Sequence, residues 1–181
     1  MKHARRGLLV LVCAVLASRC GYSLAGRGSF LPPEIKIIGV PPFVNRTTIF
    51  NLETQLTQKV RSEFIGRGRY QILPEATGVD AVLTGEVTSV SMQPTSFTGD
   101  QIASRYVITM SASVVLRDVK ANEVLWENPS LVFRQEYDAP GAQQAGGAID
   151  PAAFLGQDLN ALDRMTNDFA RTIVSAILEA F

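Results

Sequence analysis

Residues 105–117 alternate between apolar and polar side chains, and this stretch constrains the fold more than any other in the chain. The even positions are apolar: Tyr106, Ile108, Met110, Ala112, Val114 and Leu116. The odd positions are mostly polar: Arg105, Thr109, Ser111, Ser113 and Arg117, with Val107 and Val115 as exceptions. A period of two places successive side chains on opposite faces of a strand. The stretch therefore predicts a strand of an antiparallel sheet with one buried face and one wet face.

A helical period is found in the segment that follows residue 50. Its apolar stripe consists of Leu52, Leu56, Val60 and Phe64, widened by Ile65. Residues spaced by three or four lie on one face of a helix, so this segment predicts an amphipathic helix laid on a sheet. Asn51 or Thr48 is expected to cap its start, and Gly66 suits its end.

A second helix is predicted at the end of the chain. Asp150-Pro151 supplies an N-cap followed by a proline in the first turn, which is a strong helix start. The apolar stripe consists of Leu155, Leu159, Leu162, Met165, Phe169, Ile173, Ile177 and Phe181. The helix is expected to run for roughly 30 residues, or about 45 Å. We expect it to pack on the core, with a partner surface as the alternative use of its length.

The remaining segments complete the predicted fold. Further strands are expected at 35–40, 70–73, 80–92 and 123–135, and Gln93–Ser104 reads as a polar loop containing Pro94, Gly99 and Asp100. The predicted class is α+β, with a single layer of mostly antiparallel or mixed sheet of four to five strands. The two amphipathic helices are expected to pack on one face of this sheet. One domain is predicted over residues 35–181.

The first residues have the layout of a secretory signal peptide. Three basic residues, Lys2, Arg5 and Arg6, precede an apolar run over residues 8–17, and small residues follow. A helix of roughly ten residues is about 15 Å long, which is half the hydrocarbon thickness of a bilayer. We therefore predict a cleaved signal peptide at 1–19 and a lipidated tether at 20–34.

Cys20 admits two interpretations. In the first it is the lipidated first residue of a lipoprotein, whose thiol receives a diacylglycerol before cleavage; Ala17 and Ser18 suit that processing, whereas Arg19 departs from the usual small residue. In the second, cleavage follows Ala17 and leaves a free thiol, which is unusual in an exported protein. We expect lipidation, which would attach the chain stably to a membrane.

The mature chain lacks the residues that most enzymes use. After Cys20 it contains no cysteine, and its single histidine, His3, lies in the leader. Cys/His zinc sites, thiol catalysis and Ser-His-Asp arrangements are thereby excluded. Four of the 17 basic residues lie in the leader, which leaves 13 basic against 17 acidic residues and a net charge of about −4. We predict no enzymatic activity, no metal, no cofactor and no nucleic-acid partner.

A series of short motifs carries a resemblance to a known family. In chain order they are CGYSL at residues 20–24, VPPFVNRT at 40–47, DAVLTG at 80–85, VLWENP at 124–129, FRQEY at 133–137 and FARTIVSAILE at 169–179. Together they resemble the lipopolysaccharide-assembly lipoproteins of the outer membrane, the LptE-like family. Each motif alone is modest, but their order spans nearly the whole mature chain.

The resemblance implies a non-enzymatic protein on the periplasmic face of the outer membrane. Such proteins plug a large β-barrel partner of the LptD type, help that barrel assemble, and contact lipopolysaccharide on its way to the surface. From charge and placement we predict that Arg105 and Arg117 on the wet sheet face contact lipid phosphates; the alternative is that they are solvated strand-end residues. The 93–104 loop is the segment predicted to enter the barrel lumen.

Two other classes of function have to be compared with this one, and only the first fits a part of the sequence. The VPPFVNRT motif followed by an amphipathic helix also resembles curli-type pore lipoproteins and the amino-terminal domain of the Tol-system propeller protein. The chain would then be a structural lipoprotein of another secretion complex. A periplasmic enzyme using carboxylates alone would need two acids converging across a cleft, and a single sheet-and-helix layer predicts no such cleft.

Overall fold

A single mixed sheet forms one layer of the computed structural model, which describes residues 31–67, 69–97, 103–138, 151–157 and 159–181. Within these ranges the strands are β1 (Ile37–Gly39), β2 (Val44–Asn45), β3 (Gln71–Leu73), β4 (Ala81–Phe97), β5 (Ala103–Asp118) and β6 (Val124–Asp138). Their order is β3-β1-β4-β5-β6, and the short β2 also pairs with β4. The predicted α+β class is confirmed. Among the described residues the sheet has six strands and not the four to five expected, because Val44 and Asn45 form an additional short strand that pairs with β4.

The three long strands β4, β5 and β6 are antiparallel, whereas β1 pairs in parallel with both β3 and β4. The alternation predicted for residues 105–117 is confirmed in β5. Its inward side chains from Tyr106 to Leu116 are all buried, and Arg105 and Arg117 are exposed. Val107, which breaks the alternation, is nevertheless only 8% exposed on the outer face.

The loop predicted at 93–104 is wrong over most of its length. Residues 93–97 continue β4, and residues 103–104 already belong to β5; residues 98–102 lie outside the described ranges. Pro94 sits opposite Tyr106, next to a register shift in the ladder, which is where a strand tolerates proline. Residues 93–97 therefore pair with β5 and continue β4, although their polar sequence favours a loop locally.

Strand β6 runs without interruption past Pro129. The ladder with β5 shifts register there, because Ala112 pairs with Leu131 while Val114 pairs with Asn128. A bulge of this kind accommodates the missing proline N–H. β6 is also an edge strand of the sheet, the position where a proline costs least.

Helix α2 (Leu52–Gly66) confirms the first predicted helix. Its four stripe residues, Leu52, Leu56, Val60 and Phe64, are all fully buried. Ile65 does not widen the stripe, since it is 59% exposed. The predicted side-chain cap is also wrong: Asn51 takes a left-handed conformation with φ 62° and makes no capping hydrogen bond.

The long carboxy-terminal helix is divided into α3 (Pro151–Gln157) and α4 (Leu159–Leu178). Position 158 and the predicted cap at 150 lie outside the described residues. The stripe is buried from Leu162 to Ile177, and Leu155 is buried in α3. Phe181 does not extend it, because the helix ends before that residue and its side chain is 42% exposed.

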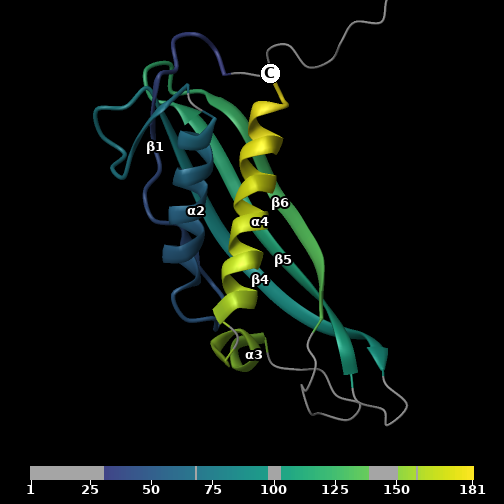
Figure 1. Cartoon of the computed structure of the whole chain (residues 1–181). Coiled ribbons are helices and arrows are strands. Elements are labelled where there is room, and N and C mark those ends of the chain that lie inside the picture. The colour runs from purple at the N-terminus through teal and green to yellow at the C-terminus, as the bar shows by residue number, and fades with distance from the viewer. Residues whose placement is uncertain (1–30, 68, 98–102, 139–150, 158) are drawn as a thin grey trace, which may run out of the picture.

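Helices α2 and α4 lie side by side along one face of the sheet, as predicted (Figure 1). A Lys59–Asp163 ion pair of 2.7 Å joins the two helices, and the rings of Phe133 on β6 and Phe169 on α4 lie 5.5 Å apart. Figure 1 also shows that the far ends of β4 and β5 extend past the helices, beyond α3. The core therefore lies between the helix pair and the inner face of the long strands.

The segment that precedes β1 is fixed to the domain. Leu31, within the predicted tether, is buried at 4% exposure, and its backbone N–H donates to the Tyr70 hydroxyl at 3.1 Å. Residues 1–30, including the predicted signal peptide and Cys20, lie outside the described ranges. The domain boundaries at 19 and 34 remain predictions.

Asp80 joins three parts of the sheet and makes stability depend on pH. Its carboxylate accepts from the Lys120 ammonium at 2.6 Å and from the backbone N–H groups of Lys36 and Ile37. These bonds, that of Lys120 foremost, lower the pKa of Asp80 from 3.8 to about 2. The stabilisation is therefore complete above pH ~4 and is lost as the pH falls towards 2, where the carboxylate takes up a proton.

We expect Asp80→Asn to lower the melting temperature at pH 7 and to have little effect near pH 2. Thermal unfolding of the two proteins across this pH range measures the difference. Glu127→Gln is the matched control, because Glu127 is an exposed carboxylate of β6 and its loss should leave both curves unchanged. A constant difference between Asp80→Asn and wild type at every pH would contradict the assigned role.

Candidate docking surface and lipid contacts

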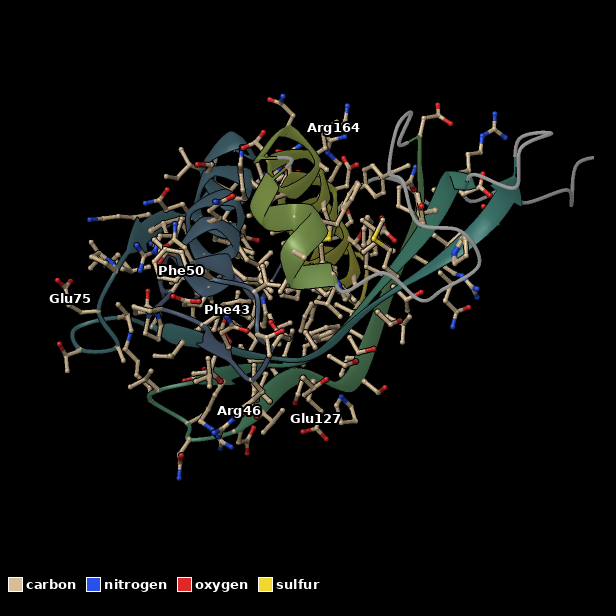
Figure 2. All side chains as sticks on the ribbon, turned by 90° about the horizontal axis from the view of Figure 1, so that it is seen from below. Phe43, Arg46, Phe50, Glu75, Glu127 and Arg164 are labelled. Carbon is tan, nitrogen blue, oxygen red and sulfur yellow. The ribbon has the colours of Figure 1, made fainter. Side chains whose placement is uncertain are left out.

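The face of the sheet opposite the helices is a candidate interaction surface. No described element packs over the outer side chains of β4, β5 and β6, and Figure 2 shows the labelled Arg46 and Glu127 on this side. Near its centre Ser111 of β5 lies opposite Ser89 of β4 on one side and Val132 of β6 on the other. We call this surface the outer face.

The outer face carries charged side chains from all three long strands, and several of them are paired. Arg46 contacts Glu86 at 2.9 Å, and Arg105 contacts Asp138 at the same distance. Both pairs are largely exposed, so each contributes little to stability. Val132 is 53% exposed near the centre. The surface thus combines hydroxyl groups, ion pairs and the charged side chains of Glu127, Arg134 and Glu136 with one exposed valine, and it suits docking better than catalysis.

The two predicted lipid-contact residues share the outer face but lie at opposite ends of it. Arg105 and Arg117 are separated by twelve positions of one strand, or roughly 40 Å at about 3.3 Å per residue. The Arg105 guanidinium is held by Asp138, and Arg117 donates to the carbonyl of Asn122 at 3.3 Å. The structure therefore does not bring them together into one site, and their contact with lipid remains a prediction.

Two tyrosines on the opposite, inner face were not singled out from the sequence. Tyr106 and Tyr137 face each other across β5 and β6, and both are buried. No described protein group accepts or donates a hydrogen bond at either hydroxyl. Burial raises the pKa of Tyr137 to about 12, and Arg164 lies 5.7 Å from the centre of its ring. The phenols pack against apolar neighbours, among them Phe154, and serve the core.

Other kinds of site find no support among the residues that the structure describes. Within these ranges no three His, Cys, Asp or Glu side chains gather closely enough to hold a metal ion. None of the described helices combines the length and apolar character that a membrane span requires. Cys20, the predicted lipidation site, lies outside the described ranges, so its modification remains a prediction.

Comparison with solved structures supports the fold. The hypothetical protein CT253 of Chlamydia trachomatis aligns with a TM-score of 0.52 at 12% identity, over 80% of this chain and 96% of that one. The rare lipoprotein B of Shewanella oneidensis aligns with a TM-score of 0.50 at 14% identity, over the same shares. At these identities the likeness establishes a shared fold alone. No curated protein matches the sequence significantly.

The family is settled by a sequence profile and not by these structures. The profile of the LptE family, described as lipopolysaccharide-assembly, matches residues 35–177. The matched range begins just before β1 and ends one residue before the end of α4, so it contains every described strand and helix except for that last residue. The chain therefore belongs to the LptE family of lipopolysaccharide-assembly proteins.

Proposed function

We propose that this protein is an outer-membrane lipoprotein, anchored at Cys20, that docks within a β-barrel partner of the LptD type. It helps that barrel to assemble and contacts lipopolysaccharide on the way to the cell surface. Its role is structural and not catalytic, in keeping with the assembly function of the family. The observation that carries the docking proposal is the uncovered outer face of β4, β5 and β6.

The dimensions of the outer face suit the lumen of a barrel. Strand β5 has 16 residues and so extends over roughly 50 Å, which exceeds the ~30 Å hydrocarbon thickness of a bilayer. The lumen of an outer-membrane barrel is polar. The hydroxyl and charged side chains of the outer face can hydrogen-bond to such a wall directly or through bridging waters.

The lipid contacts are part of the same proposal. Because Arg105 and Arg117 lie so far apart, each would meet a separate phosphate or a separate lipid. The Asp138 carboxylate competes with a phosphate for Arg105, whereas the partner of Arg117 among the described residues is a backbone carbonyl. Arg117 is therefore the stronger of the two candidates.

One pull-down tests docking and lipid contact together. Full-length protein is purified from detergent-solubilised outer membranes, and the co-purifying proteins and lipopolysaccharide are measured by mass spectrometry. Ser111→Arg places a long cation at the centre of the outer face and is expected to reduce the recovered barrel protein at least tenfold. Asn160→Arg adds the same side chain on the exposed side of α4 and should recover it as wild type does.

Three results would contradict parts of this proposal. Equal recovery of the barrel with Ser111→Arg would exclude the outer face as the docking surface. Lipopolysaccharide recovery by Arg105→Ala/Arg117→Ala equal to wild type would remove these two residues from the lipid contacts. Purification as a homo-oligomeric ring without a barrel would favour the alternative function, a structural lipoprotein of another secretion complex.

A further inference from the structure

An apolar pocket lies where the start of α2 meets α3 and α4. Its volume is ≈ 420 Å³, and its floor consists of Ile49, Leu155 and Leu162, which are at most 3% exposed. Three separate segments supply this floor, so the pocket forms only when the chain is folded. Figure 2 looks onto this end of the molecule and labels Phe50 beside the start of α2. The volume falls within the range of about 300–1,000 Å³ typical of ligand pockets.

Phe50 stands on the rim of this pocket with 92% of its side chain exposed, more than any other large apolar side chain of the described residues. The next residue, Asn51, has φ 62°, one of two left-handed non-glycine positions in the described chain. Asparagine tolerates this conformation better than most residues. The turn leaves Phe50 outside the core while its neighbour Ile49 enters it.

The chemistry of the lining restricts what the pocket can hold. None of its eight lining residues is charged, so it offers no ion pair to a phosphate or carboxylate. The polar groups near the rim are the hydroxyl and amides of Thr48, Asn51 and Gln55, which suit neutral ester, amide or hydroxyl groups. An aliphatic floor with a neutral polar rim matches a hydrocarbon chain joined to a lipid by an ester or amide.

We propose that this pocket binds one acyl chain of a lipid, with Phe50 packing over the chain. The inference rests on the proposed function, because a lipopolysaccharide-assembly protein meets acylated lipid as its cargo. The pocket lies on the helix side of the molecule, away from the outer face proposed to dock in the barrel. The same molecule can therefore hold an acyl chain and a barrel partner at once.

Photo-crosslinking with a phosphatidylcholine whose ester-linked acyl chain carries a diazirine near its methyl end tests the proposal. The full-length protein is reconstituted in phosphatidylcholine vesicles, and labelled peptides are identified by mass spectrometry. We expect labels on peptides that contain Ile49–Asn51 and Ala152–Leu162. Phe50→Ser, which removes an exposed ring, should lower labelling about tenfold. Ala152→Trp, which fills the pocket, should lower it at least as much.

Ile65→Ser is the matched control, because it removes an exposed apolar side chain near the other end of α2 and should leave labelling unchanged. Equal labelling of all variants, or labels confined to other peptides, would overturn the acyl-chain site. If Phe50→Ser no longer co-purified the barrel protein but was labelled like wild type, the acyl-chain site would also be overturned. The pocket would then bind a side chain of the partner protein. Pocket labelling without any co-purifying barrel would instead contradict the proposed function and leave the site standing.

Discussion

Replacing Cys20 by serine is expected to abolish the lipid anchor and to move the purified protein from the detergent phase to the aqueous phase. The thiol is the only group at this position able to form the thioether that carries the diacylglycerol. Each buried CH₂ of an acyl chain contributes about 0.8 kcal/mol to membrane binding, so two chains provide stable attachment and their loss leaves none. The partition is measured on purified protein, so that a bound barrel partner cannot hold the variant in the detergent phase.

Intact mass of the same samples identifies the modification directly. Wild-type protein should begin at Cys20 and be heavier than its polypeptide by the acyl groups. Cys13→Ser is the matched control, because Cys13 lies in the predicted signal peptide and its replacement should leave the mature protein unchanged. An unmodified Cys20, or a chain that starts at Ser18, would show that Arg19 prevents lipidation and that cleavage follows Ala17.

The elements predicted best from the sequence are those in which local pattern and tertiary packing agree. The alternation of β5 and the stripe of α2 each place a full set of apolar residues on one face, and these faces are buried. The prediction failed where packing overrides local sequence. Pro94 and its polar neighbours favour a loop, yet they pair along β5 because that strand presents a continuous partner. The apolar stripe continues from Leu155 to Ile177 and so predicts one helix, although the structure has two, α3 and α4.

The outer face, the pocket beside Phe50 and the buried tyrosine pair also differ in how far the sequence reveals them. The outer face follows from the odd positions of a single strand, so its polar character is visible in the sequence. The pocket beside Phe50 unites residues about 100 positions apart, and the buried tyrosine pair unites two strands. Register and helix packing create these sites, and neither is encoded in a local pattern. Phe50 indicates a binding site only because the structure shows that it is exposed, and the sequence does not reveal that exposure.

Gly85→Ala is expected to destabilise the fold by about 3 kcal/mol, at the upper end of the usual cost of overpacking. A Cβ at position 85 would overlap the ring carbons of Phe43. That ring is only 3% exposed, and the Phe43 N–H donates to the Thr57 hydroxyl of α2 at 2.9 Å. Phe43 therefore has little room to move, and the new methyl group would separate the β1–β2 segment from β4.

Denaturant unfolding of Gly85→Ala in two backgrounds tests whether this clash is the cause. In the Phe43→Ala background the ring is absent, so the additional cost of Gly85→Ala should fall below about 1 kcal/mol, as expected for coupled neighbours. Gly66→Ala is the control, since no heavy atom lies within 4 Å of the added methyl group and alanine favours the helix. An equal cost in both backgrounds would mean that the backbone conformation at position 85 requires glycine. The close approach of the Phe43 ring would then not be the reason for glycine at this position.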